Sequence, residues 1–105
     1  MIIDDTIAIN RLFDYYGSLL TDRQQEVFRF YYHEDYSYQE IADLLNISRA
    51  AVYDNLKRAK DSLINYEDKL RFSSRFDDLI NALQELKIED VDKLIEKFYS
   101  GGKYD

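Results

Sequence analysis

Apolar side chains recur every three or four residues along most of the chain, which is the spacing of one buried helix face. Proline is absent, and glycine occurs at only three positions, so few points in the sequence interrupt such helices. The pattern therefore predicts an all-α protein. The apolar stripes lie at residues 9–16, 27–32, 41–45, 52–63, 76–86 and 91–98.

The residues around these stripes predict where several helices begin and end. Gly17 follows the first stripe and is expected to end that helix in the left-handed conformation. Thr21 is placed to cap the second helix, with Gln24 as its partner in a capping box. Neither glycine nor proline occurs from residue 49 to residue 70. This stretch predicts one helix of about 22 residues and about 33 Å.

Residues 37–63 have the features of a helix-turn-helix motif. Ser37 and Glu40 form a second capping box at the start of the first helix. The Asn-Ile-Ser segment 46–48 interrupts the apolar pattern; its Asn tolerates the left-handed conformation, and its Ser can cap the next helix. Ala42 is small enough to let the two helices cross closely. A turn of three residues gives the steep crossing that frees the second helix to enter a DNA groove.

Two protein families resemble this motif and its surroundings. Residues 21–63 are similar to region four of bacterial sigma factors, through the segment TDRQQEVFRFYYHEDYSYQEIADLLNISRAAVYDNLKRAKDSL. Residues 12–59 resemble more closely the YlxM family of small helix-turn-helix proteins, and the segments specific to it are FDYYGSLLT and ISRAAVYDNLKRA. The likeness continues through the acidic C-terminal half and so covers essentially the whole chain.

The resemblance to the YlxM family implies both a fold and a set of partners. The implied fold is a sigma region four-like helix-turn-helix bundle, followed by a C-terminal pair of amphipathic helices. The genes of that family stand beside those of the signal recognition particle in Firmicutes, and the family is thought to regulate or assist that pathway. Protein components of the signal recognition particle are therefore candidate partners.

A break expected at residues 71–74 divides the chain. The prediction is a helix-turn-helix domain at residues 1–70 and a C-terminal helical segment at residues 71–105. The C-terminal segment is expected to pack either on that domain or on a second subunit. Because the predicted helices offer more apolar surface than one small core absorbs, we expect a homodimer, the commonest closed assembly.

Charge is distributed unevenly along the chain. The net charge is −7, and an acidic surface repels phosphate. Residues 37–60, in contrast, carry four basic and three acidic side chains. This stretch is either a DNA-binding surface or a solvated helix face with ordinary charge mixing. All four basic residues lie on the second helix of the motif: Arg49, Lys57, Arg58 and Lys60.

The outward face of that helix supplies the candidate DNA-binding residues. If Val52 and Leu56 point inward, the exposed positions match the groove-facing positions of the sigma-like motif. Arg49 is expected to bind a guanine edge, Ala50 to contact a thymine methyl group, and Asp54 to accept a hydrogen bond from cytosine. Tyr53 and three residues expected at the phosphates, Ser48, Lys57 and Arg58, complete the predicted duplex DNA site.

A second hypothesis assigns the protein to another class, in which the motif is a scaffold and DNA is not bound. The aromatic and acidic surfaces then bind a basic protein, with signal recognition particle components as candidates. The ten tyrosines bear on this hypothesis, because a small core cannot supply hydrogen-bond partners for all their hydroxyl groups. They indicate either an aromatic contact surface or the compositional bias of the source genome.

The sequence contains no pattern typical of an enzyme, a cofactor site or a metal centre. Cysteine is absent, and the single histidine, His33, lies in a predicted turn without a nucleophile arranged beside it. Adjacent carboxylates on a helix point about 100° apart and do not form a catalytic pair. We therefore expect a protein that is not an enzyme. No apolar run is long enough to span a membrane and no signal peptide is evident, so the expected location is the cytoplasm.

Overall fold

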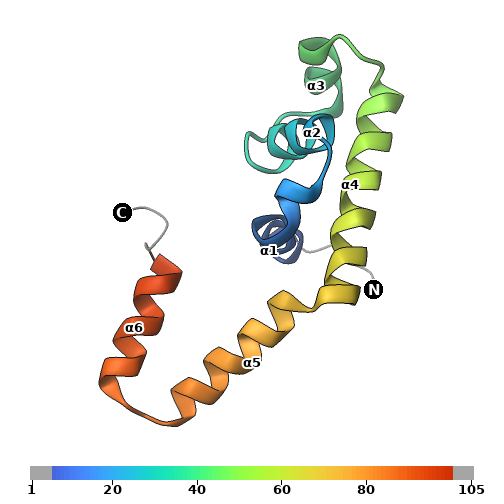
Figure 1. Ribbon diagram of the computed structural model, residues 1–105. Helices are drawn as coiled ribbons and strands as arrows, with labels where there is room; N and C mark the ends of the chain where they lie inside the picture. The colour runs from blue at the N-terminus through green and yellow to red at the C-terminus, as the bar shows by residue number, and fades with distance from the viewer. Residues whose placement is uncertain (1–5, 101–105) are drawn as a thin grey trace. The chain divides into compact units, whose positions relative to one another are not determined.

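The computed structural model describes residues 6–100, and every regular element within that range is helical, which confirms the predicted all-α class. Figure 1 shows the order of the elements along the chain. The chain divides into two compact units between Arg71 and Phe72. The elements are α1 (Thr6–Tyr16), η1 (Gly17–Leu19), α2 (Asp22–Tyr32), α3 (Tyr38–Leu45), α4 (Arg49–Leu70), α5 (Phe72–Glu85) and α6 (Glu89–Ser100).

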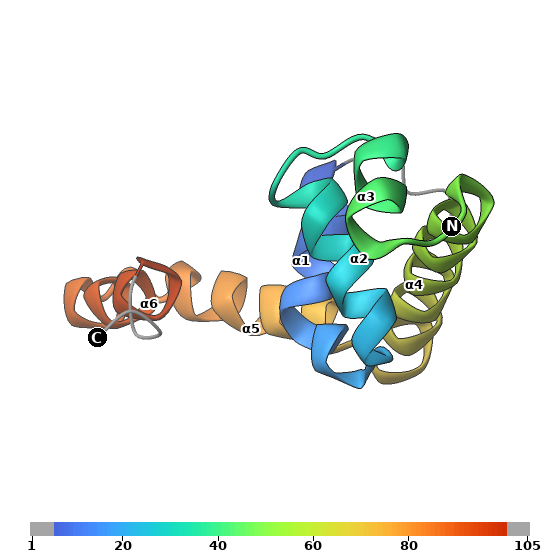
Figure 2. The ribbon, with the colours of Figure 1, turned by 90° about the horizontal axis from the view of Figure 1, so that it is seen from above.

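In the first unit, α4 is the element against which α1, α2 and α3 all pack (Figures 1 and 2). Its buried stripe is Val52, Leu56, Ala59 and Leu63, as the helical spacing predicts. Two apolar clusters form along this stripe. The first cluster consists of Ile9, Leu12, Phe13, Tyr16, Leu20, Phe28, Ala59 and Leu63. The second cluster consists of Val27, Ile41, Ala42, Val52 and Leu56.

The predicted capping residues take up their expected roles. The Thr21 hydroxyl accepts a hydrogen bond from the Gln24 amide at 3.1 Å, and the side chain of Gln24 completes the capping box. Ser37 and Glu40 form the same arrangement at the start of α3. These caps satisfy backbone donors that have no partner inside the helix, and each is worth about 1 kcal/mol.

Gly17 is not the left-handed helix cap that the sequence predicts. No glycine among the described residues has a positive φ, and Gly17 instead opens the 3₁₀ turn η1. A Cβ atom at this position would lie 2.9 Å from the ring of Phe13. The position therefore requires glycine because an aromatic ring packs against its backbone, and not because of its backbone conformation.

The break between the two units is shorter than the expected residues 71–74. Arg71 alone separates α4 from α5, and it takes the left-handed conformation with φ 57°. Helix α5 begins at the next residue, Phe72, and ends at Glu85. One residue in this conformation is enough to end a helix and redirect the chain.

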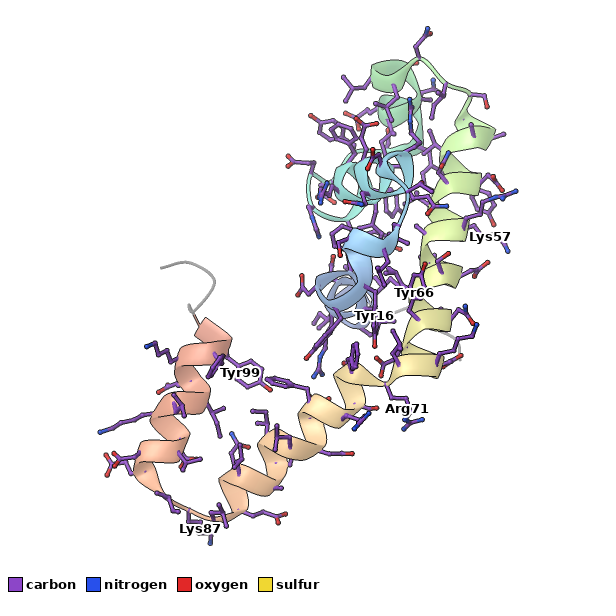
Figure 3. The ribbon with its side chains drawn as sticks, viewed as in Figure 1. Tyr16, Lys57, Tyr66, Arg71, Lys87 and Tyr99 are labelled. Atoms are coloured by element: carbon purple, nitrogen blue, oxygen red, sulfur yellow. The ribbon has the colours of Figure 1, made fainter. Side chains whose placement is uncertain are left out.

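The second unit is a pair of helices, α5 and α6, that contact each other. The turn between them contains Lys87, which has φ 54° and is labelled in Figure 3. Ile80 and Ile95 are the buried apolar side chains of this unit, and the ring of Phe76 meets that of Tyr99 with centroids 6.1 Å apart. Further large apolar side chains of this unit are more than half exposed: Leu79, Leu86, Leu94, Phe98 and Tyr99.

The tyrosines are distributed mostly at the margins of the clusters. Within residues 6–100, Tyr16 alone is fully buried, and its hydroxyl donates a hydrogen bond to Glu67 Oε1 at 2.6 Å (Figure 3). Tyr53 and Tyr99 are exposed, and the remaining described tyrosines are half-buried.

None of the helices in the described range is long and apolar enough to cross a membrane.

Candidate nucleic-acid interface

Helices α3 and α4 form the predicted helix-turn-helix. Three residues connect them, and Asn46 takes the left-handed conformation with φ 55°. The backbone amide of Ile47 donates to the Ala42 carbonyl at 3.1 Å, and the side chain of Ile47 packs against the second cluster. Ser48 then caps α4 by accepting a hydrogen bond from the Ala51 amide at 3.0 Å. The turn is therefore fixed at both ends, which sets the direction of α4.

The seven predicted DNA-binding residues share the exposed face of α4 and its cap. Val52 and Leu56 are buried in the second cluster, so the helix phase is the predicted one. All seven are exposed, and they span the cap and the first half of the helix. This is the part of a recognition helix that meets base edges in helix-turn-helix complexes. They are Ser48, Arg49, Ala50, Tyr53, Asp54, Lys57 and Arg58.

Two of the basic side chains on this face are paired with carboxylates of the same helix. Arg58 Nε lies 2.8 Å from Asp54 Oδ2, and Lys57 Nζ lies 3.2 Å from Asp61 Oδ2. All four side chains are mostly exposed; Figure 3 shows Lys57 projecting from the side of α4 that faces away from α1 and α2. Exposed pairs contribute about 0–1 kcal/mol, so a phosphate can replace either carboxylate at small cost.

Arg49 differs from the other cations of the motif. It is exposed at the first residue of α4, and no hydrogen bond or ion pair engages its guanidinium within the described part of the chain. Lys60, in contrast, is half-buried. Arg49 is therefore the cation of the motif with the greatest freedom to bind a ligand at the start of α4.

Beside Arg49 lies a row of three tyrosines that the sequence did not predict. The ring of Tyr38 stacks on that of Tyr31 with centroids 5.1 Å apart and an interplanar angle of 29°. The ring of Tyr53 meets Tyr38 edge-on, with centroids 6.2 Å apart. The row joins α2, α3 and α4, and it places an aromatic surface next to the predicted DNA contacts.

The row perturbs the ionisation of its central member. Burial, and then a hydrogen bond with Tyr31, raise the pKa of the Tyr38 phenol above its ordinary value of 10.0. Tyr38 is therefore neutral at physiological pH and adds no negative charge to the surface.

Within residues 6–100 no group of three histidine, cysteine or acidic side chains is placed to hold a metal ion.

Comparison with known proteins identifies relatives over most of the chain. The family described as "Putative helix-turn-helix protein, YlxM / p13 like", UPF0122, matches residues 3–99. A UPF0122 protein of Oceanobacillus iheyensis is 44% identical over 95 residues, which is 90% of each chain. One of Thermoanaerobacter sp. is 49% identical over 84 residues, covering 80% of this chain and 72% of the relative. The family description names a helix-turn-helix and no enzymatic activity.

Proposed function

The chain belongs to the UPF0122 family of YlxM/p13-like helix-turn-helix proteins, and we propose that it binds duplex DNA through α4 to regulate transcription. The observation that carries this proposal is the exposed face at the start of α4. Arg49 there has no competing partner among the described residues, and the caps at both ends of the turn fix the direction of the helix. In such a motif the second helix enters the major groove.

Each exposed side chain has a contact that its chemistry suits. The Arg49 guanidinium is the group for a guanine edge, the Ala50 methyl for a thymine methyl, and Asp54 for the amino group of cytosine. Phosphates are bound by the Ser48 hydroxyl and by two cations, Lys57 and Arg58, which are paired with carboxylates in the free protein. The Asp54–Arg58 pair must open for Asp54 to reach a base, which couples base recognition to a phosphate contact by Arg58.

The regulated genes are proposed from the family resemblance to belong to the signal recognition particle pathway. This role places the protein in the cytoplasm with the chromosome. The −7 net charge then acts against phosphate binding everywhere except on α4. We therefore expect weak binding to arbitrary DNA and useful affinity only for a preferred sequence.

Selection from a randomised duplex pool at low salt tests this proposal. We expect enrichment of a defined sequence, and Arg49→Ala to weaken binding to it by about 1–3 kcal/mol and relax specificity at one base pair. Lys69→Ala is the matched control, since Lys69 is an exposed cation in the last turn of the same helix. Equal effects of the two substitutions would contradict base recognition by Arg49.

The alternative function is a protein-interaction module that binds a basic component of the signal recognition particle. The pairing of Lys57 and Arg58 with carboxylates favours this alternative, because it lowers the positive charge that α4 offers to DNA. This alternative predicts negligible duplex binding at any salt concentration. It also predicts that capture of the basic partner survives Arg49→Ala.

We also propose that residues 1–70 form the DNA-binding domain and that residues 71–105 form a dimerisation segment. The second unit leaves more than half of the surface of Leu79, Leu94 and Phe98 exposed. A pair of helices this short rarely folds stably without an oligomeric partner. A second copy of the chain offers a matching apolar face, because a two-fold interface is self-complementary.

A further inference from the structure

A recess of about 340 Å³ opens beside the recognition helix, where α2, α3 and α4 meet. Its volume equals that of roughly ten water molecules in the liquid. The recess is shallow and largely open to solvent, and it has room for one planar ring system of the size of a nucleobase. Its lining residues are Tyr31, Ser37, Tyr38, Gln39 and Arg49.

The aromatic wall of the recess is a packed cluster of rings. The ring of Tyr38 stacks on that of Tyr31 and lies at 76° to that of Tyr53, with centroids 6.2 Å apart. Both Tyr31 and Tyr38 are half-buried, so part of each side chain remains accessible to solvent. Aromatic side chains that are fixed before binding lose little conformational entropy when a ligand arrives. A flat ligand can therefore extend this stack at small entropic cost.

The polar groups of the recess suit the edges of a base. The Arg49 guanidinium has no partner in the described part of the chain, and it can both stack on a ring and donate hydrogen bonds. One amide hydrogen of Gln39 is engaged by Asp43 at 2.9 Å, which fixes the orientation of the side chain. The Gln39 carbonyl oxygen has no partner among residues 6–100 and is available as an acceptor. Ser37 is already occupied as the cap of α3.

The charge of the surface favours stacking over phosphate contacts. Two of the four cations of the motif are paired with carboxylates, and the neutral phenol of Tyr38 does not repel phosphate. Stacking of a base on an aromatic ring contributes about 1–3 kcal/mol and tolerates any sequence. It requires an exposed base face, which a closed duplex does not offer outside its ends.

We propose that this recess binds one unpaired nucleobase of single-stranded DNA or RNA, stacked on Tyr38 and held by Arg49 and Gln39. The inference extends the proposed DNA-binding function, with which it shares Arg49. An unpaired base at this place adjoins the duplex contacts of α4. The protein therefore recognises a junction of paired and unpaired nucleic acid better than a closed duplex.

Titration of fluorescent oligonucleotides tests the inference. The probes are an unstructured single strand of DNA, the same strand as RNA, and a blunt duplex of that sequence, each at 50 mM salt. Tyr38→Ala is expected to weaken single-strand binding by about 5- to 150-fold, the effect of about 1–3 kcal/mol. Duplex binding should change less than twofold. Tyr38→Phe keeps the ring and should bind as the wild type does.

Tyr99→Ala is the matched control for the single-strand probes, since Tyr99 is an exposed tyrosine outside the first unit and should not change their binding. Quenching of a 2-aminopurine placed in the single strand reports stacking directly, and it should be lost with Tyr38→Ala. Equal binding of DNA and RNA shows that the base alone is held, and preference for RNA adds a contact to the 2′-hydroxyl; both support the inference.

Two outcomes would overturn the inference. The first is duplex binding without single-strand binding, which leaves the proposed function standing. The second is an equal loss of binding to the single strand and to the duplex in both Tyr38→Ala and Tyr38→Phe. That result would indicate a structural role for the Tyr38 hydroxyl. Absence of binding to every probe overturns the inference, whereas the proposed function is tested separately by selection from the randomised duplex pool.

Discussion

The two units of the chain bury their apolar residues to very different extents. In the described part of the first unit, thirteen apolar side chains are buried; in that of the second, two are buried, Ile80 and Ile95. Helix α4 gives its unit a stripe that three other helices cover. Helices α5 and α6 contact each other and still expose leucines and a phenylalanine.

The difference shows what amphipathic spacing alone can and cannot indicate. Both units carry apolar residues at helical intervals, and the stripe of α6 is as clear in the sequence as that of α4. A stripe predicts that a helix needs a partner, but it does not say which one. In the first unit the partner is within the chain. For the second unit we propose that the partner is another copy.

The largest expected effect is the fall in stability caused by a substitution that disrupts the second cluster. Val52 has no exposed surface, so Val52→Asp places an unpaired carboxylate in an apolar cluster. We expect the free energy of unfolding to fall by roughly 3 kcal/mol or more. Leu79→Asp is the matched substitution in the second unit, where Leu79 is 54% exposed. Urea unfolding of the separated monomers should show a small change for Leu79→Asp, and similar changes for the two would remove the contrast between the units.

A smaller effect is expected on assembly. Leu94 and Phe98 are 56% and 69% exposed on α6, and burial of one such side chain contributes about 1.5–3 kcal/mol. Substitution of either by aspartate should weaken dimerisation at least tenfold with little change in helix content. Sedimentation equilibrium at micromolar concentration measures this. A wild-type chain that sediments at 12.6 kDa would contradict the proposed dimer.

The hydrogen bond from Tyr16 to Glu67 tests the first unit more finely. Tyr16→Phe removes a short hydrogen bond to a carboxylate and leaves the ring in place. We expect a loss of about 1.5 kcal/mol, since hydrogen bonds to charged groups contribute about 1.5–3 kcal/mol. Tyr66→Phe is the control, because the Tyr66 ring lies 6.0 Å from that of Tyr16 and its hydroxyl has no partner within residues 6–100. Identical thermal unfolding of the two variants would show that the bond contributes nothing.

The smallest effect is a dependence of stability on high pH. The pKa of Tyr38 is raised in the folded chain, first by burial and then by the Tyr31 hydrogen bond. Well below pH 10 the phenol is neutral in both states, so its ionisation does not affect stability there. As the pH rises above 10, the unfolded chain ionises first and stability falls. Urea unfolding between pH 9 and pH 11 measures this fall in the free energy of unfolding, and Tyr38→Phe should remove the part that Tyr38 contributes. An unchanged pH profile in Tyr38→Phe would contradict the raised pKa.

Most of the fold was predictable because its determinants are local. The caps at Thr21, Ser37 and Ser48 act within three residues, and the stripe of α4 needs only the helical repeat. The family resemblance is likewise confirmed, since the family matches residues 3–99. The role of Gly17 was not predictable from its neighbours, because it depends on where the Phe13 ring packs.

The candidate site was predictable only in part. Helix phase alone places its seven residues on one exposed face, and both ion pairs lie at i,i+4 spacing, a signal that was present in the sequence. The Tyr31–Tyr38–Tyr53 row was not predictable, because its members come from three helices whose crossing sets their distances. The DNA contacts themselves and the roles assigned to residues 1–70 and 71–105 remain predictions.

A salt titration of duplex binding tests the central claim most directly, because it counts the cations of α4 that displace counterions from DNA. Residues 49–60 of α4 carry four basic side chains, which allow at most about four phosphate or base contacts, so counterion release predicts a log–log slope of roughly −4 per protomer. A dimer that engages two half-sites should give roughly −7. Arg49→Ala should make the slope shallower by about one per protomer if its side chain displaces a counterion. Undetectable binding across a randomised duplex pool at 50 mM salt would contradict the account and favour the protein-interaction module.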